Sequence, residues 1–340
     1  MRAVGYGPER RGSGPDCLRD LTLPEPELRP NDLLVQVEAV AINPVDTKVR
    51  RRETPAAGSW RVLGWDAAGT VVCCGSAVTS FRPGDRVWYA GALDRPGCQS
   101  ELHAVDHRLV AHRPANLGAD AAAALPLTAI TAWELLFDRL RLSSGPEAHG
   151  EETLLVVGGA GGVGSILVQL ALRLTGLTVV ATASKAASVD WLHSLGVTHV
   201  IDHHRPLADQ LQRLALPPVR QAISLTHSGD HFAALVDLLE PQGALALIDD
   251  PPAQAIDVLA MKRKSLSLHW ELMFTRSLYQ TADMAEQGKV LARLRDMVQA
   301  GQIRSTLQRQ LGPIHAAGLQ EAHRLIEQGS TIGKIVLAGW

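Results

Sequence analysis

The sequence predicts an α/β protein in which a doubly wound parallel sheet is joined to a β-rich part. Two patterns indicate this architecture: short strands with Gly and Pro between them before residue 125, and apolar strands alternating with helical patterns from Leu154 onward. The third observation is a glycine-rich turn between an apolar strand and an apolar helical pattern, Gly159-Ala160-Gly161-Gly162-Val163-Gly164. Strand, glycine turn, helix and strand follow one another there, as in the first unit of a doubly wound sheet.

The β-rich part comes first along the chain. Residues 33–41 alternate like a half-buried strand, and residues 69–74 and 87–89 are further strand candidates. From Ala119 the pattern becomes helical, with helices expected at 121–125 and 131–140 and Pro126 between them. Residues 143–152 are expected to form a polar linker before the sheet.

The strands of the parallel sheet are expected at 154–157, 179–181, 200–201, 222–225 and 244–248, with a sixth candidate at 266–272. Helices are expected between several of them, at 186–195, 207–214 and 231–239. Two amphipathic helices, 284–300 and 316–327, and a short strand at 334–337 complete the pattern.

The glycine turn fits G-x-G-x-x-G, the pattern that seats a dinucleotide pyrophosphate. Gly159 permits the tight turn, Gly161 lets the backbone approach the pyrophosphate, and Gly164 allows close packing of the helix. Ala160, Gly162 and Val163 complete the loop, and the helix N-terminus offers N–H groups to the phosphates. The alternative is a glycine-rich turn without a ligand.

The residues after the second strand favour NADPH over NADH. An NAD site usually has a carboxylate about 20 residues past the glycines, to bond the ribose 2′-hydroxyl. Here Ser184 and Lys185 stand at the strand tip, a hydroxyl and an ammonium that suit a 2′-phosphate. His203, after the third strand, is expected over the same region. The alternative is that Lys185 is an ordinary surface lysine.

Composition excludes several classes of protein. The chain has 340 residues, enough for two domains, and a formal net charge of −2, which favours neither nucleic acid nor membrane surfaces. No apolar run has the length of a signal-peptide core at the N-terminus or of a membrane span elsewhere, so we expect a cytoplasmic protein. Four cysteines, too few for a disulfide framework, are expected to be thiols: Cys17, Cys73, Cys74 and Cys98.

Five segments together resemble the medium-chain dehydrogenase/reductase superfamily, and within it the zinc-free quinone oxidoreductase branch, which includes proteins labelled zinc-type alcohol dehydrogenase-like. Besides the glycine turn they are residues 43–50, 64–69, 81–87 and 126–133. The resemblance covers essentially the whole chain. It implies a GroES-like catalytic domain at 1–127 and 275–340, a Rossmann domain at 128–274, a cleft at their junction and a homodimer.

The resemblance also bears on metal binding. Zinc alcohol dehydrogenases of this superfamily hold the metal through Cys and His ligands. In this sequence Asn43 stands where the first Cys would be, Trp65 stands where the His would be, and Val45 replaces a hydroxyl of the proton relay. The cysteine-rich lobe of a structural zinc is missing as well. We therefore predict a protein without metal.

Without a Lewis acid, a reduced nicotinamide can still give hydride to a strong electrophile such as a quinone or an α,β-unsaturated carbonyl. By its place in the resemblance, Asn43 is expected to donate to a developing oxyanion, or else to form a turn. Asp46 would orient its neighbours or Arg50, or be structural. Lys48 would donate a proton, stabilise an enolate or face solvent. Trp65 would line the pocket or pack in the core.

Further cofactor contacts follow from the resemblance and from the rule that open α/β sheets bind ligands at the carboxyl ends of their strands. They are Thr128, Thr226, His227, Ile248, Asp249 and Lys334. The sequence thus predicts a zinc-independent, NADPH-dependent reductase of a small electrophile. Two alternatives stay open: a zinc alcohol dehydrogenase with displaced ligands, and an NADPH-binding structural or sensing protein with little catalysis.

Overall fold

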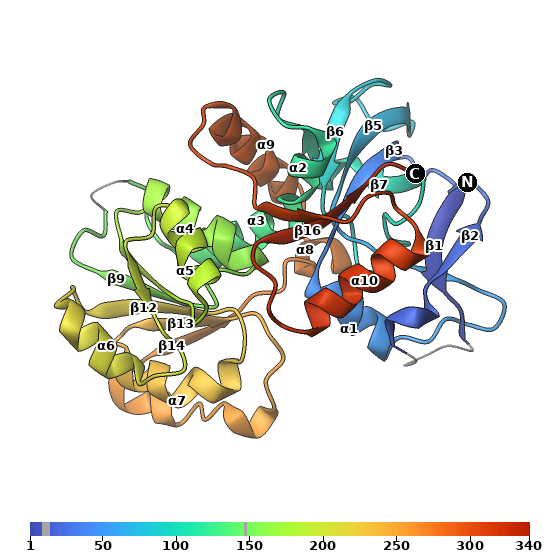
Figure 1. The fold of residues 1–340 in the computed structure, drawn as a ribbon. Coiled ribbons are helices and arrows are strands. Elements are labelled where there is room, and N and C mark those ends of the chain that lie inside the picture. Colours follow the sequence, from blue (N-terminus) through green and yellow to red (C-terminus); the bar gives the residue numbers. More distant parts are fainter. Residues whose placement is uncertain (9–13, 146–147) are drawn as a thin grey trace. The chain divides into compact units, whose positions relative to one another are not determined.

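The computed structural model describes residues 1–8, 14–145 and 148–340, and the chain divides into two compact units. Unit 1 comprises residues 1–130 and 274–340, and unit 2 comprises residues 131–273 (Figure 1). The boundaries predicted from the sequence are 127/128 and 274/275. Unit 1 is thus made from both ends of the chain.

Within the described residues, unit 2 is built on a parallel sheet of six strands in the order β11-β10-β9-β12-β13-β14. Because β9, the first of these strands in the chain, lies in the middle, the sheet grows outward in both directions, which is the doubly wound arrangement. The predicted fold class is confirmed. The strands are β9 (Thr153–Val157), β10 (Thr178–Thr182), β11 (His199–Ile201), β12 (Val219–Ser224), β13 (Ala244–Leu247) and β14 (Ser267–Trp270).

Helices cover both faces of this sheet. Figure 1 shows α4 and α5 on one side of the strands and α6 and α7 on the other. Their bounds are α4 (Gly162–Leu174), α5 (Ala186–Ser194), α6 (Leu207–Leu214) and α7 (Ser228–Leu238).

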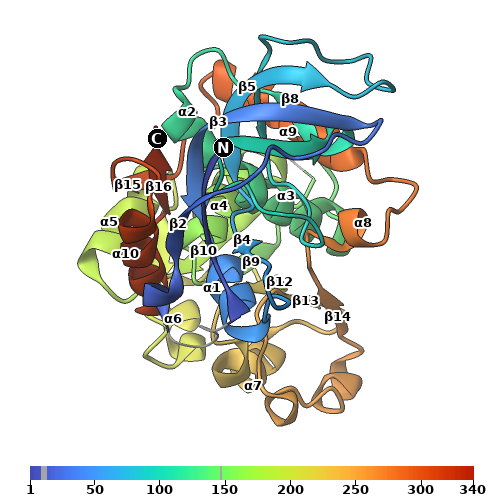
Figure 2. The ribbon, with the colours of Figure 1, turned by 90° about the vertical axis from the view of Figure 1, so that its right-hand side faces the viewer.

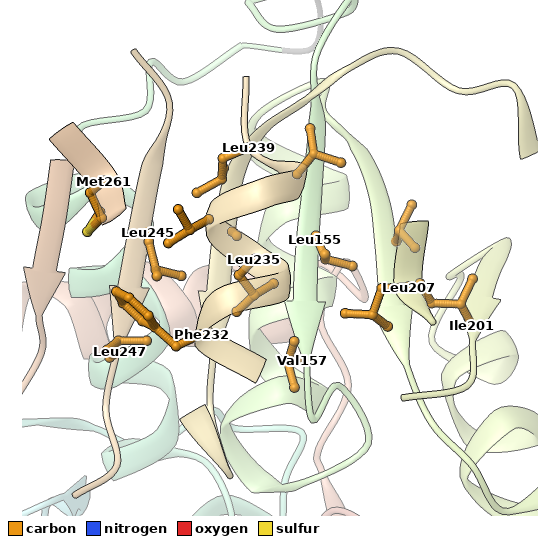
Figure 3. Close-up of a cluster of buried hydrophobic side chains, with 14 residues drawn as sticks. Leu155, Val157, Ile201, Leu207, Phe232, Leu235, Leu239, Leu245, Leu247 and Met261 are labelled. Carbon is orange, nitrogen blue, oxygen red and sulfur yellow. The ribbon is translucent and has the colours of Figure 1, made fainter. Parts of the chain in front are cut away.

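The core under α7 shows why these segments fold as they do. Figure 3 shows Phe232 and Leu235 of α7 directed toward Leu155, Leu245 and Leu247 of the strands. The two α7 residues are three positions apart and therefore share a helix face. Burying such a side chain stabilises the fold by about 2 kcal/mol, so this apolar face holds α7 on the sheet.

Unit 1 contains two sheets. In the described part of the chain, one has seven strands, β15-β16-β3-β5-β6-β8 with β7 also paired to β3, and the other has three, β2-β1-β4. Figure 2 shows β16, near the C-terminus, beside β3, near the N-terminus. The strands are β1 (Arg2–Tyr6), β2 (Arg19–Thr22), β3 (Asp32–Ile42), β4 (Arg61–Val62), β5 (Ala67–Cys74), β6 (Arg86–Tyr89), β7 (Leu102–Asp106), β8 (Val110–His112), β15 (Leu307–Gln310) and β16 (Lys334–Ala338).

The α-helices that begin in unit 1 are α1 (Pro44–Arg52), α2 (Ala119–Ala123), α3 (Pro126–Trp133), α8 (Thr275–Leu278), α9 (Glu286–Gln299) and α10 (Ala316–Glu327). A π-helical stretch, Glu134–Arg139, continues α3. Pro126 therefore begins α3 instead of only separating two helices, because the first turn of a helix does not need its missing N–H. α7 likewise begins three residues before the expected 231.

One helical run in the described residues, 119–139, is long and apolar enough to cross a membrane by length and composition. In this structure 78% of its most apolar window is buried inside the protein. Burial of that kind is what a core helix shows.

Candidate functional site

The glycine turn lies between β9 and α4, as expected, but its glycines divide their roles differently. Gly158, one residue before the motif, takes the left-handed conformation with φ of +82°. Gly159 is required by packing, since an added Cβ would lie 2.7 Å from the Cβ of Ala181 in β10. The expectation that Gly159 makes the tight turn is therefore corrected.

Gly161 differs from these two, because the protein itself does not require a glycine there. The nearest atom to a Cβ added at Gly161 is the Gly158 carbonyl oxygen, 3.6 Å away, an ordinary contact. Gly161 precedes α4, and no side chain caps the helix at this position. Space beside the backbone and uncapped N–H groups fit a phosphate-bearing ligand. Gly162 and Val163, in the first turn of α4, are both half-buried.

The ends of β10 and β11 bring the expected 2′-phosphate residues to one edge of the sheet. The Ala183 amide donates to the Ile201 carbonyl at 2.9 Å, which holds the two strand ends together. Ser184 is half-buried, and Lys185 is exposed at the start of α5. His203, two residues beyond Ile201, is half-buried. Its pKa is lowered mainly by burial and secondly by the neighbouring His204 imidazole.

The loops after β12 and β13 meet at the N-terminus of α7. The Thr226 hydroxyl and His227 Nδ1 lie 2.8 Å apart, and His227 has a left-handed φ of 51°. Asp249 Oδ2 accepts from the Ser228 amide at 3.0 Å, so this carboxylate caps α7. Ile248, next to it, is half-buried. Contact of these residues with a cofactor stays a prediction.

A buried polar network in unit 1 joins several expected residues. Asn43 Nδ2 donates to Asp66 Oδ2 at 3.0 Å, and the Lys334 ammonium donates to the same oxygen at 2.9 Å and to Asn43 Oδ1. The amide of Leu127 donates to Asp66 Oδ1 at 2.9 Å. Asp66 thus receives donors from three separate segments of unit 1. Both ends of the Asn43 amide and the Lys334 ammonium are engaged here, and their roles toward substrate and cofactor stay predictions.

Asp46 belongs to the same region through the main chain of Asn43. Its Oδ2 accepts from the Asn43 amide at 2.8 Å, which fixes the start of α1. Burial raises the pKa of Asp46 to about 7, and burial also raises the pKa of Asp66 in spite of the neighbouring Lys334. Arg50 does not pair with Asp46. Its guanidinium contacts His323 and Glu327 of α10 instead.

The other expected unit 1 residues take structural contacts. Trp65 is buried, its Nε1 donates to the Ala92 carbonyl at 3.0 Å, and its ring meets Phe274 edge-on at 6.1 Å. The Thr128 hydroxyl donates to the Leu125 carbonyl at 3.1 Å. Lys48 is half-buried. The core-packing alternative thus describes the contacts of Trp65 in this structure.

Sequence reasoning did not single out Asp66, although it lies in the apolar segment 62–72. A carboxylate inside such a run signals a buried partner elsewhere in the chain. That signal could have identified Asp66, but it could not have identified Lys334 as the partner.

Two family descriptions match the chain. Residues 29–124 match the alcohol dehydrogenase GroES-like domain, and residues 195–337 match zinc-binding dehydrogenase. A zinc-type alcohol dehydrogenase-like protein of Staphylococcus aureus (strain MSSA476) is 36% identical over 311 residues, which is 90% of each chain. A 2-methylene-furan-3-one reductase of Solanum lycopersicum is 35% identical over 232 residues, 64% of this chain and 58% of the relative.

Two solved structures similar to this chain point to the same family. A proposed zinc-dependent alcohol dehydrogenase from Rhizobium etli CFN 42 is 48% identical with a TM-score of 0.94, covering 100% of this chain and 98% of that one. The quinone oxidoreductase from Coxiella burnetii is 26% identical with a TM-score of 0.81, covering 100% and 99%. The chain therefore belongs to the medium-chain dehydrogenase/reductase superfamily of oxidoreductases.

Proposed function

We propose that the protein is a zinc-independent, NADPH-dependent oxidoreductase that reduces quinones or α,β-unsaturated carbonyls. The observation that carries the proposal is the Lys334 ammonium bound to Asn43 and Asp66. Two similar proteins are named for these substrate classes, the tomato reductase for an unsaturated ketone and the Coxiella protein for quinones.

The residues of this chain do not fit a zinc ion, although the names of several relatives include one. Zinc needs thiolate, imidazole or carboxylate ligands in a near-tetrahedral array. The Trp65 indole has no lone pair to offer, and its N–H already donates to Ala92. The Lys334 ammonium beside Asn43 would repel a divalent cation. Among the described residues, no group of three or more His, Cys, Asp or Glu side chains could hold a metal.

The residues of unit 2 do fit a dinucleotide. The backbone of Gly161, Gly162 and Val163 would hold the pyrophosphate at the uncapped start of α4. Ser184 and Lys185 would hold a 2′-phosphate. When bound, NADPH supplies a hydride, and an electron-poor acceptor can receive it without help from a Lewis acid.

In unit 1, the network fixes the position of Asn43. Asp46 fixes the main chain of Asn43, while Asp66 and Lys334 fix its side chain. Because the pKa of Asp46 is near 7, this carboxyl carries a proton part of the time at neutral pH. Lys48 is two residues further along α1, which places it on a different face of the helix from Asp46. Lys48 and Asp46 therefore cannot act as a pair.

The proposal is tested by measuring NADPH consumption with a panel of quinones and with a panel of enones. The reverse reaction is measured as NADP⁺ reduction by saturated alcohols. We expect turnover with one of the first two panels in chelator-washed protein without zinc. Stoichiometric zinc needed for activity would support the alcohol dehydrogenase alternative, and tight NADPH binding without turnover would support the structural or sensing alternative. Lys185→Asp should reverse the preference for NADPH over NADH.

We also propose that the protein is a cytoplasmic homodimer whose partner is a small electrophile, and that it binds neither nucleic acid nor membranes. The near-neutral charge supports the second part, since binding to such polyanions depends on basic surfaces. Light scattering coupled to size-exclusion chromatography tests the dimer, and a monomeric mass would contradict it.

A further inference from the structure

Four imidazoles gather at the carboxyl edge of the parallel sheet, and we call them the histidine cluster. They belong to His203 and His204, after β11, and to His227 and His231, at the start of α7. The ring centroid of His203 lies 4.5 Å from that of His204 and 6.2 Å from that of His231. His227 acts electrostatically on both His203 and His231. Among the described residues no three or more His, Cys, Asp or Glu side chains are placed to hold a metal ion, so metal binding does not account for the cluster.

Three carboxylates also lie around the cluster. Asp202 accepts from the amide of His204 at 2.9 Å and lies 3.5 Å from Arg205 Nε. Asp249 caps α7, and Asp230 stands beside His231 in the same helix. These are the charged groups that face the imidazoles from the loop after β11, from α7 and from the loop after β13.

The imidazoles of His203 and His231 favour the neutral form, from which each can gain a proton. Burial, and then repulsion from His204, lowers the pKa of His203. Burial also lowers the pKa of His231, with Asp230 opposing and His227 adding to the effect. His203 Nδ1 is buried and, within the described residues, has no hydrogen-bond partner. A neighbouring anion would raise both pKa values by favouring the imidazolium form.

We propose that the histidine cluster takes up a proton when a phosphate monoester binds beside it, so that the affinity for NADPH, but not for NADH, rises as the pH falls. The inference rests on the proposed use of NADPH, because the 2′-phosphate is the group by which the two cofactors differ. Paired ends of β10 and β11 bring Lys185 and His203 to one edge. Lys185 supplies a constant positive charge there, and the imidazoles supply one that depends on pH.

Calorimetric titrations in two buffers of different ionisation enthalpy, at about pH 7.5, count the protons exchanged on binding. The second pKa of a phosphate monoester is about 6, so the free cofactor contributes little at this pH. We expect net proton uptake with NADPH and none with NADH. The Kd for NADPH should fall by up to about tenfold per pH unit between about pH 8 and 7.

Three variants show which histidines take up the proton. His203→Asn and His231→Asn should reduce the uptake and flatten the pH dependence of the NADPH affinity, with little effect on NADH. His199→Asn is the matched control, because His199 lies at the opposite, amino end of β11, and it should behave like the wild type.

The outcomes separate this inference from the proposed function. Tighter binding of NADPH than of NADH without proton uptake would overturn the inference and leave the cofactor preference standing. Uptake that persists in the His203→Asn/His231→Asn double variant would also overturn it. Equal affinity for the two cofactors would overturn both.

Discussion

The Lys334 ammonium and the Asp66 carboxylate form an ion pair, 2.9 Å from Nζ to Oδ2, with side chains that are only 3% and 0% exposed. The pair joins the first residue of β16 to the residue just before β5. Since β16 comes from the C-terminal segment, this contact ties the two ends of the chain together inside unit 1.

Removing the ammonium should destabilise unit 1. Lys334→Met leaves the Asp66 carboxylate buried without its cation, at a cost of about 3–5 kcal/mol. Urea unfolding measures the loss. Asp66→Asn in the same background should recover part of it, because the amide oxygen can still accept from Leu127. A loss below about 1 kcal/mol in Lys334→Met would show that the pair contributes little.

Asp46 should make the protein less stable as the pH rises toward neutral. Burial raises its pKa from 3.8 to about 7, so the folded chain holds the proton more tightly than the unfolded chain does. The free energy of unfolding should therefore fall between about pH 4 and pH 7, by at most about 4 kcal/mol from this group. Asp46→Asn should flatten that dependence in urea unfolding curves. Asp94→Asn, an exposed carboxyl of the same unit, is the control and should leave the curve unchanged.

Two glycines of the turn should separate folding from binding. Gly161→Ala adds a Cβ with no contact shorter than 3.6 Å, so stability should change by less than about 1 kcal/mol. NADPH affinity should fall at least about tenfold, because the methyl group occupies the approach to the backbone. Fluorescence titration with NADPH and thermal unfolding measure the two effects.

Gly159→Ala is the matched comparison for Gly161→Ala. Its Cβ would lie 2.7 Å from that of Ala181, so this variant should lose about 1–3 kcal/mol of stability. Unchanged NADPH affinity in Gly161→Ala would exclude the turn as the pyrophosphate site.

The sequence predicted most of unit 2 and less of unit 1. Buried strands such as β9 and β13 are continuous apolar runs between turn residues, a local signal. β7, with the mixed sequence Leu-His-Ala-Val-Asp, and the charged helix α1 have no such run, and tertiary contacts fix them instead. Asp66 and Lys334 are 268 residues apart, so no local pattern could reveal their contact.

The strand edge that carries Ser184, Lys185 and His203 was easier to predict than the polar network, for the same reason. Ser184, Lys185 and His203 each follow a predicted strand by a few residues, and the carboxyl ends of parallel strands share one edge. Asn43 was predicted from its place in a motif. Its partners come from two other segments of the chain, which the motif does not contain.

Replacing a buried carboxyl of unit 2 should stabilise the protein at higher pH. Glu134 and Glu271 are both buried, and Arg139, whose Nε lies 2.6 Å from Glu271 Oε2, is the cation beside them. Burial, and then repulsion from Glu134, raises the pKa of Glu271 despite Arg139. The folded chain therefore retains a proton that the unfolded chain releases above its ordinary pKa of 4.5, and stability falls as the pH rises.

Glu271→Gln removes this proton while keeping an oxygen that can accept from Arg139. Above about pH 5, the free energy of unfolding of the variant should exceed that of the wild type by an amount that grows by up to about 1.4 kcal/mol per pH unit. Urea unfolding measures this difference. Glu240→Gln is the control, since Glu240 is an exposed carboxyl of the same unit. A gain that does not grow with pH would contradict the proton retained by the folded wild type, because an amide that merely packs better would stabilise the fold equally at every pH.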